Sequence, residues 1–137
     1  MILADTGAVL ALIDADDRHH ATLRDLFQQD PRSWVLPWAV LPEVDYLVSA
    51  RIGAPAAAAF VADLAAGSFA VEWGVDSDLP RAHQITRQYA ALRLGLVDAV
   101  VLAMAERLRA EAIATLDLRH FGAVRLPRSM RLLPRDL

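Results

Sequence analysis

The chain has 137 residues, of which 55% are hydrophobic, so we expect one domain over residues 1–137 with a sizeable buried core. It contains neither cysteine nor lysine, which excludes disulfides, thiolate zinc sites, P-loop phosphate binding and Schiff-base chemistry. The net charge of −3 combines residues 1–78, with 12 acids and 4 arginines, and residues 79–137, with 5 acids and 10 arginines.

Strands are predicted to alternate with helices along the whole chain. The first part is predicted to form a strand over 2–4, helices over 7–13 and 18–29, a strand over 33–36, and a helix over about 42–53. The second part is predicted to form a helix over 54–66, a strand over 69–73, helices over about 76–92 and 98–109, and strands over 112–116 and 123–126. This alternation predicts an α/β fold with a five-stranded parallel sheet flanked by helices on both faces.

Four acidic residues lie at the edges of apolar runs, where a carboxylate loses hydration. They are Asp5, Glu43, Asp98 and Asp117. The sequence places no obvious cationic side chain beside any of them. Because carboxylates that share one environment usually share a divalent cation, this pattern indicates a metal site.

The topology should bring these acids together. Asp5 and Asp117 each follow a predicted strand, and ligands of an open parallel sheet bind beyond the carboxyl ends of its strands. Glu43 and Asp98 lie near the amino ends of helices that begin at the same edge. Two carboxylates 4 Å apart repel by about 4 kcal/mol at an effective dielectric near 20, so the group needs a cation or raised pKa values. Oxygen ligands suit Mg²⁺ or Mn²⁺, which would support hydrolysis of a phosphoryl bond.

Each acid also has a purely structural explanation. Asp5 could cap the helix that follows it, Glu43 would be stabilised by the helix dipole in any case, and Asp117 could begin a turn. Asp98, surrounded by apolar residues, has few structural explanations. The functional interpretation therefore depends on the set of four.

These motifs resemble those of the PIN-domain ribonucleases, and within them the VapC-type toxins of toxin–antitoxin pairs. The resemblance covers essentially the whole chain and is carried by Asp-Thr at 5–6, Pro-Glu at 42–43, Gly-Leu-Val-Asp-Ala at 95–99, and Thr-Leu-Asp at 115–117 before Arg-His-Phe. It implies a PIN-like three-layer fold and a metal-dependent endoribonuclease that cuts RNA at an acidic Mg²⁺ or Mn²⁺ site. It also implies a homodimer that is inhibited by a small antitoxin protein.

Carried over by position, the resemblance assigns metal binding and catalysis to four acids and supporting roles to two hydroxyls. The acids are Asp5, Glu43, Asp98 and Asp117, and the hydroxyls are those of Thr6 and Thr115. Gly7 departs from the family pattern, which often has Ser or Asn after Asp-Thr, so a hydrogen bond within the site is expected to be missing or replaced by a water.

Contacts with RNA are expected from the arginine-rich last part of the chain. Arg119, two residues after Asp117, is the best placed, and Arg93 is a second candidate. The arginines near the end of the sequence could equally form a solvated tail without a helix. His120 could contact RNA or hydrogen-bond locally, and both alternatives stay open.

The second function considered is a catalytically silent PIN-like module that binds RNA or protein. A complete set of four repelling acids argues against it, because an idle site has no need of them. A phosphatase with Asp5 as nucleophile is a poor alternative, since position 7 is glycine where such enzymes need a second Asp. No apolar run reaches the roughly 18 residues of a membrane span, and no basic stretch precedes the first apolar segment. We therefore expect a cytoplasmic protein with no membrane partner.

Overall fold

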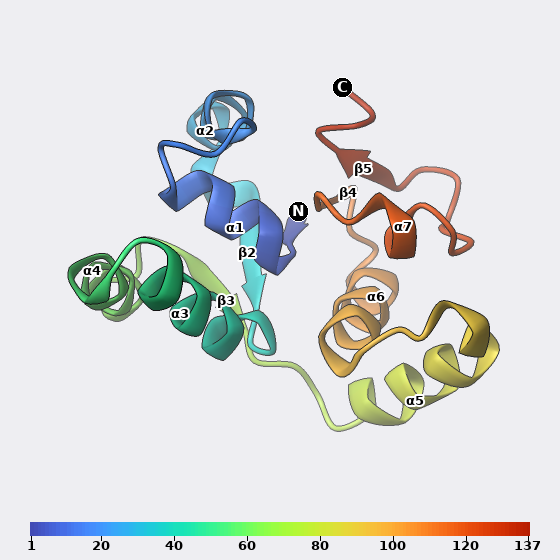
Figure 1. The fold of residues 1–137 in the computed structure, drawn as a ribbon. Coiled ribbons are helices and arrows are strands. Elements are labelled where there is room, and N and C mark those ends of the chain that lie inside the picture. The colour runs from blue at the N-terminus through green and yellow to red at the C-terminus, as the bar shows by residue number, and fades with distance from the viewer.

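A computed structural model describes residues 1–137 and shows one five-stranded parallel sheet in the order β3-β2-β1-β4-β5 (Figure 1). The strands are β1 (Ile2–Ala4), β2 (Trp34–Pro37), β3 (Ala70–Glu72), β4 (Ala112–Ala114) and β5 (Arg131–Leu133). The predicted fold class, a parallel sheet of five strands flanked by helices, is confirmed.

Seven α-helices cover the two faces of the sheet, with α1 to α4 on one side and α5 to α7 on the other (Figure 1). They are α1 (Thr6–Ile13), α2 (His20–Gln29), α3 (Val40–Arg51), α4 (Ala54–Ala65), α5 (Asp78–Gln88), α6 (Leu96–Leu108) and α7 (Leu118–Phe121). Two 3₁₀ turns, Pro31–Ser33 and Ala90–Leu92, precede β2 and follow α5. None of the helices is long and apolar enough to cross a membrane.

The central strands are buried on both faces, which explains their unbroken apolar sequences. Every residue of β1 and β4 is buried, and α6 is buried from Ala99 to Ala105. Because alanines recur in these segments, the helix can approach the sheet closely. The carboxyl ends of β1 and β4 therefore extend from the fully buried centre of the molecule.

The prediction of the fifth strand was wrong. Residues 123–126 form no strand, and Arg131–Leu133 pair with β4 instead. Leu132 and Leu133 are almost completely buried, whereas Val124 and Leu126 are only partly buried, so burial decides which apolar segment joins the sheet. The last part of the chain also forms the short helix α7, contrary to the alternative of a tail without a helix.

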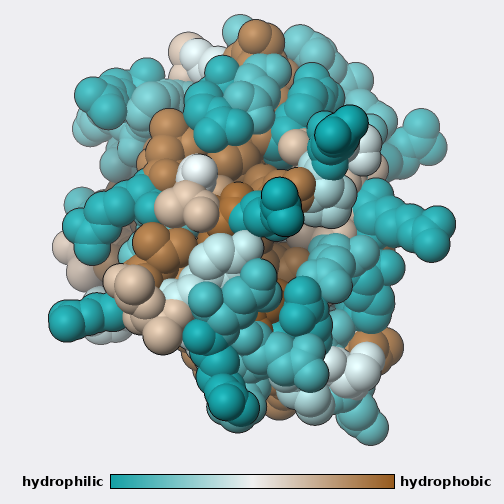
Figure 2. Space-filling model, turned by 90° about the vertical axis from the view of Figure 1, so that its right-hand side faces the viewer, coloured by the Kyte–Doolittle hydropathy of each residue, from teal (hydrophilic) through white to brown (hydrophobic).

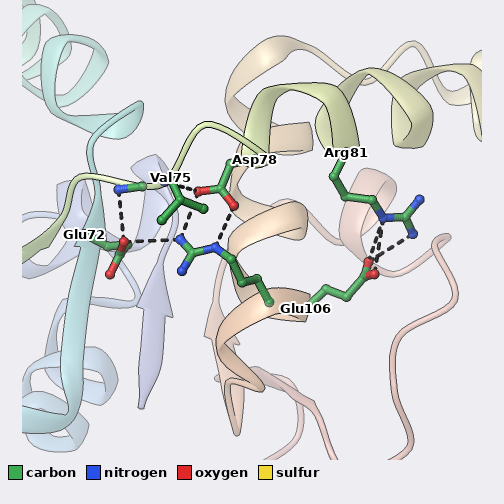
Figure 3. Close-up of polar contacts among 7 residues, drawn as sticks. Glu72, Val75, Asp78, Arg81 and Glu106 are labelled. Atoms are coloured by element: carbon green, nitrogen blue, oxygen red, sulfur yellow. Dashed lines mark hydrogen bonds and ion pairs between the residues drawn. The ribbon is translucent and has the colours of Figure 1, made fainter.

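A network of charged side chains fastens the β3–α5 connection to α6 (Figure 3). Arg107 Nε donates to Asp78 Oδ1 at 2.7 Å, and its Nη2 donates to Asp78 Oδ2 at 2.9 Å and to Glu72 Oε1 at 3.2 Å. Asp78 Oδ2 also accepts the Val75 N–H at 3.0 Å. The hydrogen bonds from Arg107 hold the pKa of Asp78 below its usual value. The network fixes where α5 begins.

Replacing Arg107 with methionine should lower the free energy of unfolding at pH 7 by about 2 kcal/mol, because the nearly buried Asp78 carboxylate loses its cationic partner. Since the folded-state pKa of Asp78 is lowered, this stabilisation is present above its unfolded-state pKa and is lost as the pH falls through the folded-state value. Urea unfolding of both proteins at pH 7 and at acidic pH measures the difference.

Arg81→Met is the matched control, since the Arg81–Glu106 pair lies between the same two helices but has side-chain exposures of 38% and 51%. Such an exposed pair contributes less than about 1 kcal/mol. Equal losses from the two variants would show that the Arg107 network contributes no more than an ordinary surface ion pair.

Candidate metal centre

The four acids singled out in the sequence all line one open depression of about 330 Å³ at the carboxyl edge of the sheet. Asp5 follows β1, Asp117 lies between β4 and α7, and Glu43 and Asp98 lie in the first turns of α3 and α6. Four separate elements thus deliver carboxylates to one place, as the topology predicts.

Asp5 is the most deeply placed of these acids, with 5% of its surface exposed. Its Oδ2 accepts a hydrogen bond of 3.0 Å from Thr115 Oγ1, and its side chain makes no capping hydrogen bond to α1. Burial raises the pKa of Asp5 to about 6, with further contributions from the charges of Asp98 and Glu43. Asp5 occupies the N-cap position of α1 without a side-chain capping hydrogen bond, and its carboxylate is in an environment that favours neutralisation or a cation.

Thr115 links two of the acids. Its hydroxyl donates to Asp5 and accepts the Asp117 N–H at 3.0 Å, so it fixes the Asp5 side chain relative to the start of the next segment. The Asp117 carboxylate caps α7 by accepting the His120 N–H at 3.1 Å. The structural explanation of Asp117 as a turn residue is therefore correct, and it coexists with a position in the depression.

The side chain of His120 lies between two of the acids, a position that the sequence did not predict. Its Nδ1 lies 3.0 Å from Asp98 Oδ2 and 3.0 Å from Asp117 Oδ2, and the three side chains offer ligand atoms within 4.8 Å of one another. An imidazole that the sequence did not place there therefore lies beside both Asp98 and Asp117. Burial raises the pKa of Asp98, and His120 partly offsets this effect. The three-residue spacing from Asp117 to His120 was the signal in the sequence.

The arginines in the neighbourhood are not those expected from the sequence. Arg51, at the end of α3, lines the same depression as Glu43. Arg119 is exposed on α7, and Arg93 lies in a left-handed turn after the second 3₁₀ segment. Neither Arg119 nor Arg93 lines the depression, and their contact with RNA stays a prediction.

The donor groups in the depression fit a divalent metal ion. Four carboxylates with no thiol suit a hard cation, and a cation would relieve the repulsion among them. Thr6 also lines the depression, and its hydroxyl is buried without any hydrogen-bond partner in the protein. At Gly7 an added Cβ would make only ordinary contacts of 3.7 Å or more with Leu116, so steric crowding is not what places a glycine there.

Comparison with known proteins agrees with this arrangement. The PIN domain family matches residues 2–125. Ribonuclease VapC26 of Mycobacterium tuberculosis is 34% identical over 124 residues, which cover 90% of this chain and 92% of the relative. The crystal structure of the VapC20 toxin of Mycobacterium tuberculosis has a TM-score of 0.79 at 24% identity, covering 90% of this chain and 94% of that one. A toxin–antitoxin complex from Klebsiella pneumoniae has a TM-score of 0.68 at 18% identity, covering 95% of both chains.

The chain therefore belongs to the PIN domain family. Within that family, the identity to Ribonuclease VapC26 confirms the resemblance to VapC-type proteins that the four motifs indicated.

Proposed function

We propose that this protein is a metal-dependent endoribonuclease that acts as the toxin of a toxin–antitoxin pair and uses Mg²⁺ or Mn²⁺. The observation that carries the proposal is the convergence of four carboxylates from four elements on one depression, with Asp5 buried and its pKa raised to about 6. The 34% sequence identity to Ribonuclease VapC26 supports RNA as the substrate. The native RNA target is a separate question from this chemistry.

Each residue of the depression has a defined role in this proposal. A bound divalent ion lowers the pKa of a water and offsets charge on a phosphoryl oxygen. In this proposal Asp5 and Asp98 would hold the ion, and Glu43 and Asp117 would complete its surroundings and help to position a water. Of the two hydroxyls, that of Thr115 fixes the Asp5 carboxylate, and that of Thr6 is a buried donor that the protein leaves unpaired. His120 holds the Asp98 and Asp117 side chains together.

Removing divalent metal should abolish cleavage of single-stranded RNA, and adding Mg²⁺ or Mn²⁺ should restore it. The ion should also stabilise the fold, by about 2.7 kcal/mol at a concentration 100 times its dissociation constant. A gel assay in EDTA and in each metal, together with thermal melts under the same conditions, measures both effects.

The outcomes separate the competing functions. Full cleavage in EDTA would contradict metal dependence. Stabilisation by metal and binding of RNA without cleavage in any metal would favour a catalytically silent module. Calcium serves as a control for stabilisation, because it also takes oxygen ligands but prefers more of them at longer distances.

We further propose that residues 1–137 act as one domain that forms a homodimer and binds a small antitoxin. The solved Klebsiella pneumoniae complex contains a toxin of the same fold with its antitoxin. Large apolar side chains open to solvent support an interface: Tyr46 is 71% exposed, Trp73 73% and Leu96 59%. Figure 2 shows hydrophobic surface among hydrophilic side chains on the face that carries α5, α7 and the C-terminal segment. Sedimentation at micromolar concentration distinguishes a dimer from a monomer.

A further inference from the structure

A second hollow, of about 230 Å³, lies directly beside the acidic depression. Both are lined by Leu116, and the second hollow is also lined by Thr115, whose hydroxyl donates to Asp5. The segment from Thr115 to Leu118 therefore forms the wall between the two. A polymer bound at the acidic depression would reach this second hollow with the monomers that follow the bound one.

The second hollow is basic where the first is acidic. Its basic lining residues are Arg18, His19 and Arg135, and no carboxylate lines it. Arg18 and His19 come from the turn between α1 and α2, and Arg135 comes from the end of the chain, so two distant segments bring the charges together. This concentration of positive charge belongs to a protein whose net charge is −3.

Arg18 is the member with the most available charge. Its Nε donates to His19 Nε2 at 3.1 Å, and it makes no ion pair with any carboxylate. The backbone N–H of His19 donates to Asp17 Oδ1 at 2.7 Å, and this hydrogen bond fixes the position of His19. The terminal nitrogens of Arg18 therefore have no protein acceptor, while the side chain is oriented by its neighbour.

Arg135 is positioned more firmly. Its Nε and Nη2 donate to the Asp136 carboxylate at 2.6 and 2.9 Å, which offsets its charge and leaves its Nη1 without a hydrogen-bond partner. It contributes a directed donor, and Arg18 contributes a guanidinium that no ion pair occupies, in a turn that also carries Asp16 and Asp17.

An RNA strand needs such a site. Phosphodiesters are repelled by the four carboxylates, and a single ion together with Arg51 offsets that repulsion only at the depression itself. A guanidinium presents paired N–H donors that match the oxygens of a phosphate. We propose that the hollow lined by Arg18, His19 and Arg135 binds a backbone phosphate of the RNA strand adjacent to the bond that is cut. This inference rests on the proposed ribonuclease function.

The test measures the affinity of the full chain for a short fluorescein-labelled single-stranded RNA of mixed sequence, by anisotropy over a series of NaCl concentrations with Mg²⁺ present. An Asp98→Asn background prevents cleavage during the measurement. Arg18→Gln in that background should weaken binding about tenfold, as expected for loss of hydrogen bonds to a charged group. The slope of log affinity against log salt should fall by roughly 0.7, the value for one phosphate contact in a single strand. Arg18→Lys should retain the slope and recover only part of the affinity, because it keeps the charge and loses the paired donors.

Arg32→Gln is the matched control, because Arg32 is an exposed arginine that precedes β2 and so lies at the opposite edge of the sheet. Circular dichroism of each variant confirms that the fold is retained. Equal affinities and salt slopes for Arg18→Gln and Arg32→Gln would overturn the proposal. So would an Arg18→Gln variant that loses affinity for an acidic peptide or a protein partner but binds RNA like the parent.

The unsubstituted protein separates failure of this inference from failure of the ribonuclease function. If it neither binds nor cuts RNA in Mg²⁺ or Mn²⁺, both proposals fail. If it cuts RNA and Arg18→Gln leaves the KM for that RNA unchanged, only the phosphate site fails. The expected result is a KM raised about tenfold with kcat little changed, since Arg18 touches the strand away from the reacting atoms.

Discussion

Replacing Asp98 with asparagine should lower the rate of RNA cleavage by roughly 100-fold or more and leave the fold intact. Asp98 reaches the acidic depression from the first turn of α6, with its Oδ2 3.0 Å from His120 Nδ1. An amide of the same shape keeps one oxygen but loses the negative charge that, in the proposed function, would hold a divalent ion. Removing even an indirect contact to a metal ligand typically costs 10–100-fold, so loss of a direct ligand should cost more. Initial rates on single-stranded RNA in Mg²⁺ and Mn²⁺ measure the effect.

Asp45→Asn provides the control for that measurement. Asp45 lies on α3 two residues from Glu43, it is exposed, and it does not line the depression. Its replacement removes the same charge from the protein without touching the candidate site and should leave the rate unchanged. An Asp98→Asn protein that cuts RNA as fast as the Asp45→Asn protein would show that the acidic depression is not the catalytic site.

The second large effect concerns stability. Without metal, Asp5→Asn should be more stable than the parent above pH 7, by up to about 3 kcal/mol. The pKa of Asp5 is raised from 3.8 to about 6, chiefly by burial, and each unit of such a shift corresponds to about 1.4 kcal/mol. Asparagine carries no charge, so it avoids the cost of ionising a buried group. Urea unfolding in EDTA at several pH values measures the difference.

The sign of the pH dependence follows from the direction of the shift. Because the folded-state pKa of Asp5 lies above its unfolded-state value, Asp5 lowers stability progressively as the pH rises from about 4 through about 6. The advantage of the asparagine variant should therefore vanish near pH 4 and reach its full size above pH 7. Saturating Mg²⁺ or Mn²⁺ should reverse the order, since only the parent retains all its metal ligands. A variant that is less stable than the parent in EDTA at pH 8 would contradict this account of Asp5.

The sequence alone predicted the sheet and the meeting of the acids because both depend on local patterns. Buried parallel strands have unbroken apolar sequences, and Asp5 and Asp117 directly follow two of them. The convergence then needed only the rule that binding sites lie beyond the carboxyl ends of the strands. Both features can be predicted without any knowledge of side-chain packing.

Features decided by tertiary packing were not predicted. Both the 123–126 and 131–133 segments are apolar enough for a strand, and only packing against β4 shows that Leu132 and Leu133 are the buried pair. The positions of His120 and Arg51 depend on how α7 and α3 are oriented against the sheet. The basic hollow was not predicted, because Arg18 lies in the turn between α1 and α2 and Arg135 follows β5, the strand that the sequence placed at the wrong residues.

The two hydrogen bonds of the Thr115 hydroxyl have a consequence for how the protein can change over time. The backbone of Asp5 donates to Ala114 O at 2.8 Å and that of Thr115 donates to Leu133 O at 2.9 Å, so both residues continue the central ladder of the sheet. With its hydroxyl joining Asp5 to the Asp117 backbone, the chemical centre inherits the rigidity of the interior. Under the proposed function, substitutions in the surrounding turns would change contacts with RNA without displacing Asp5 or Asp117.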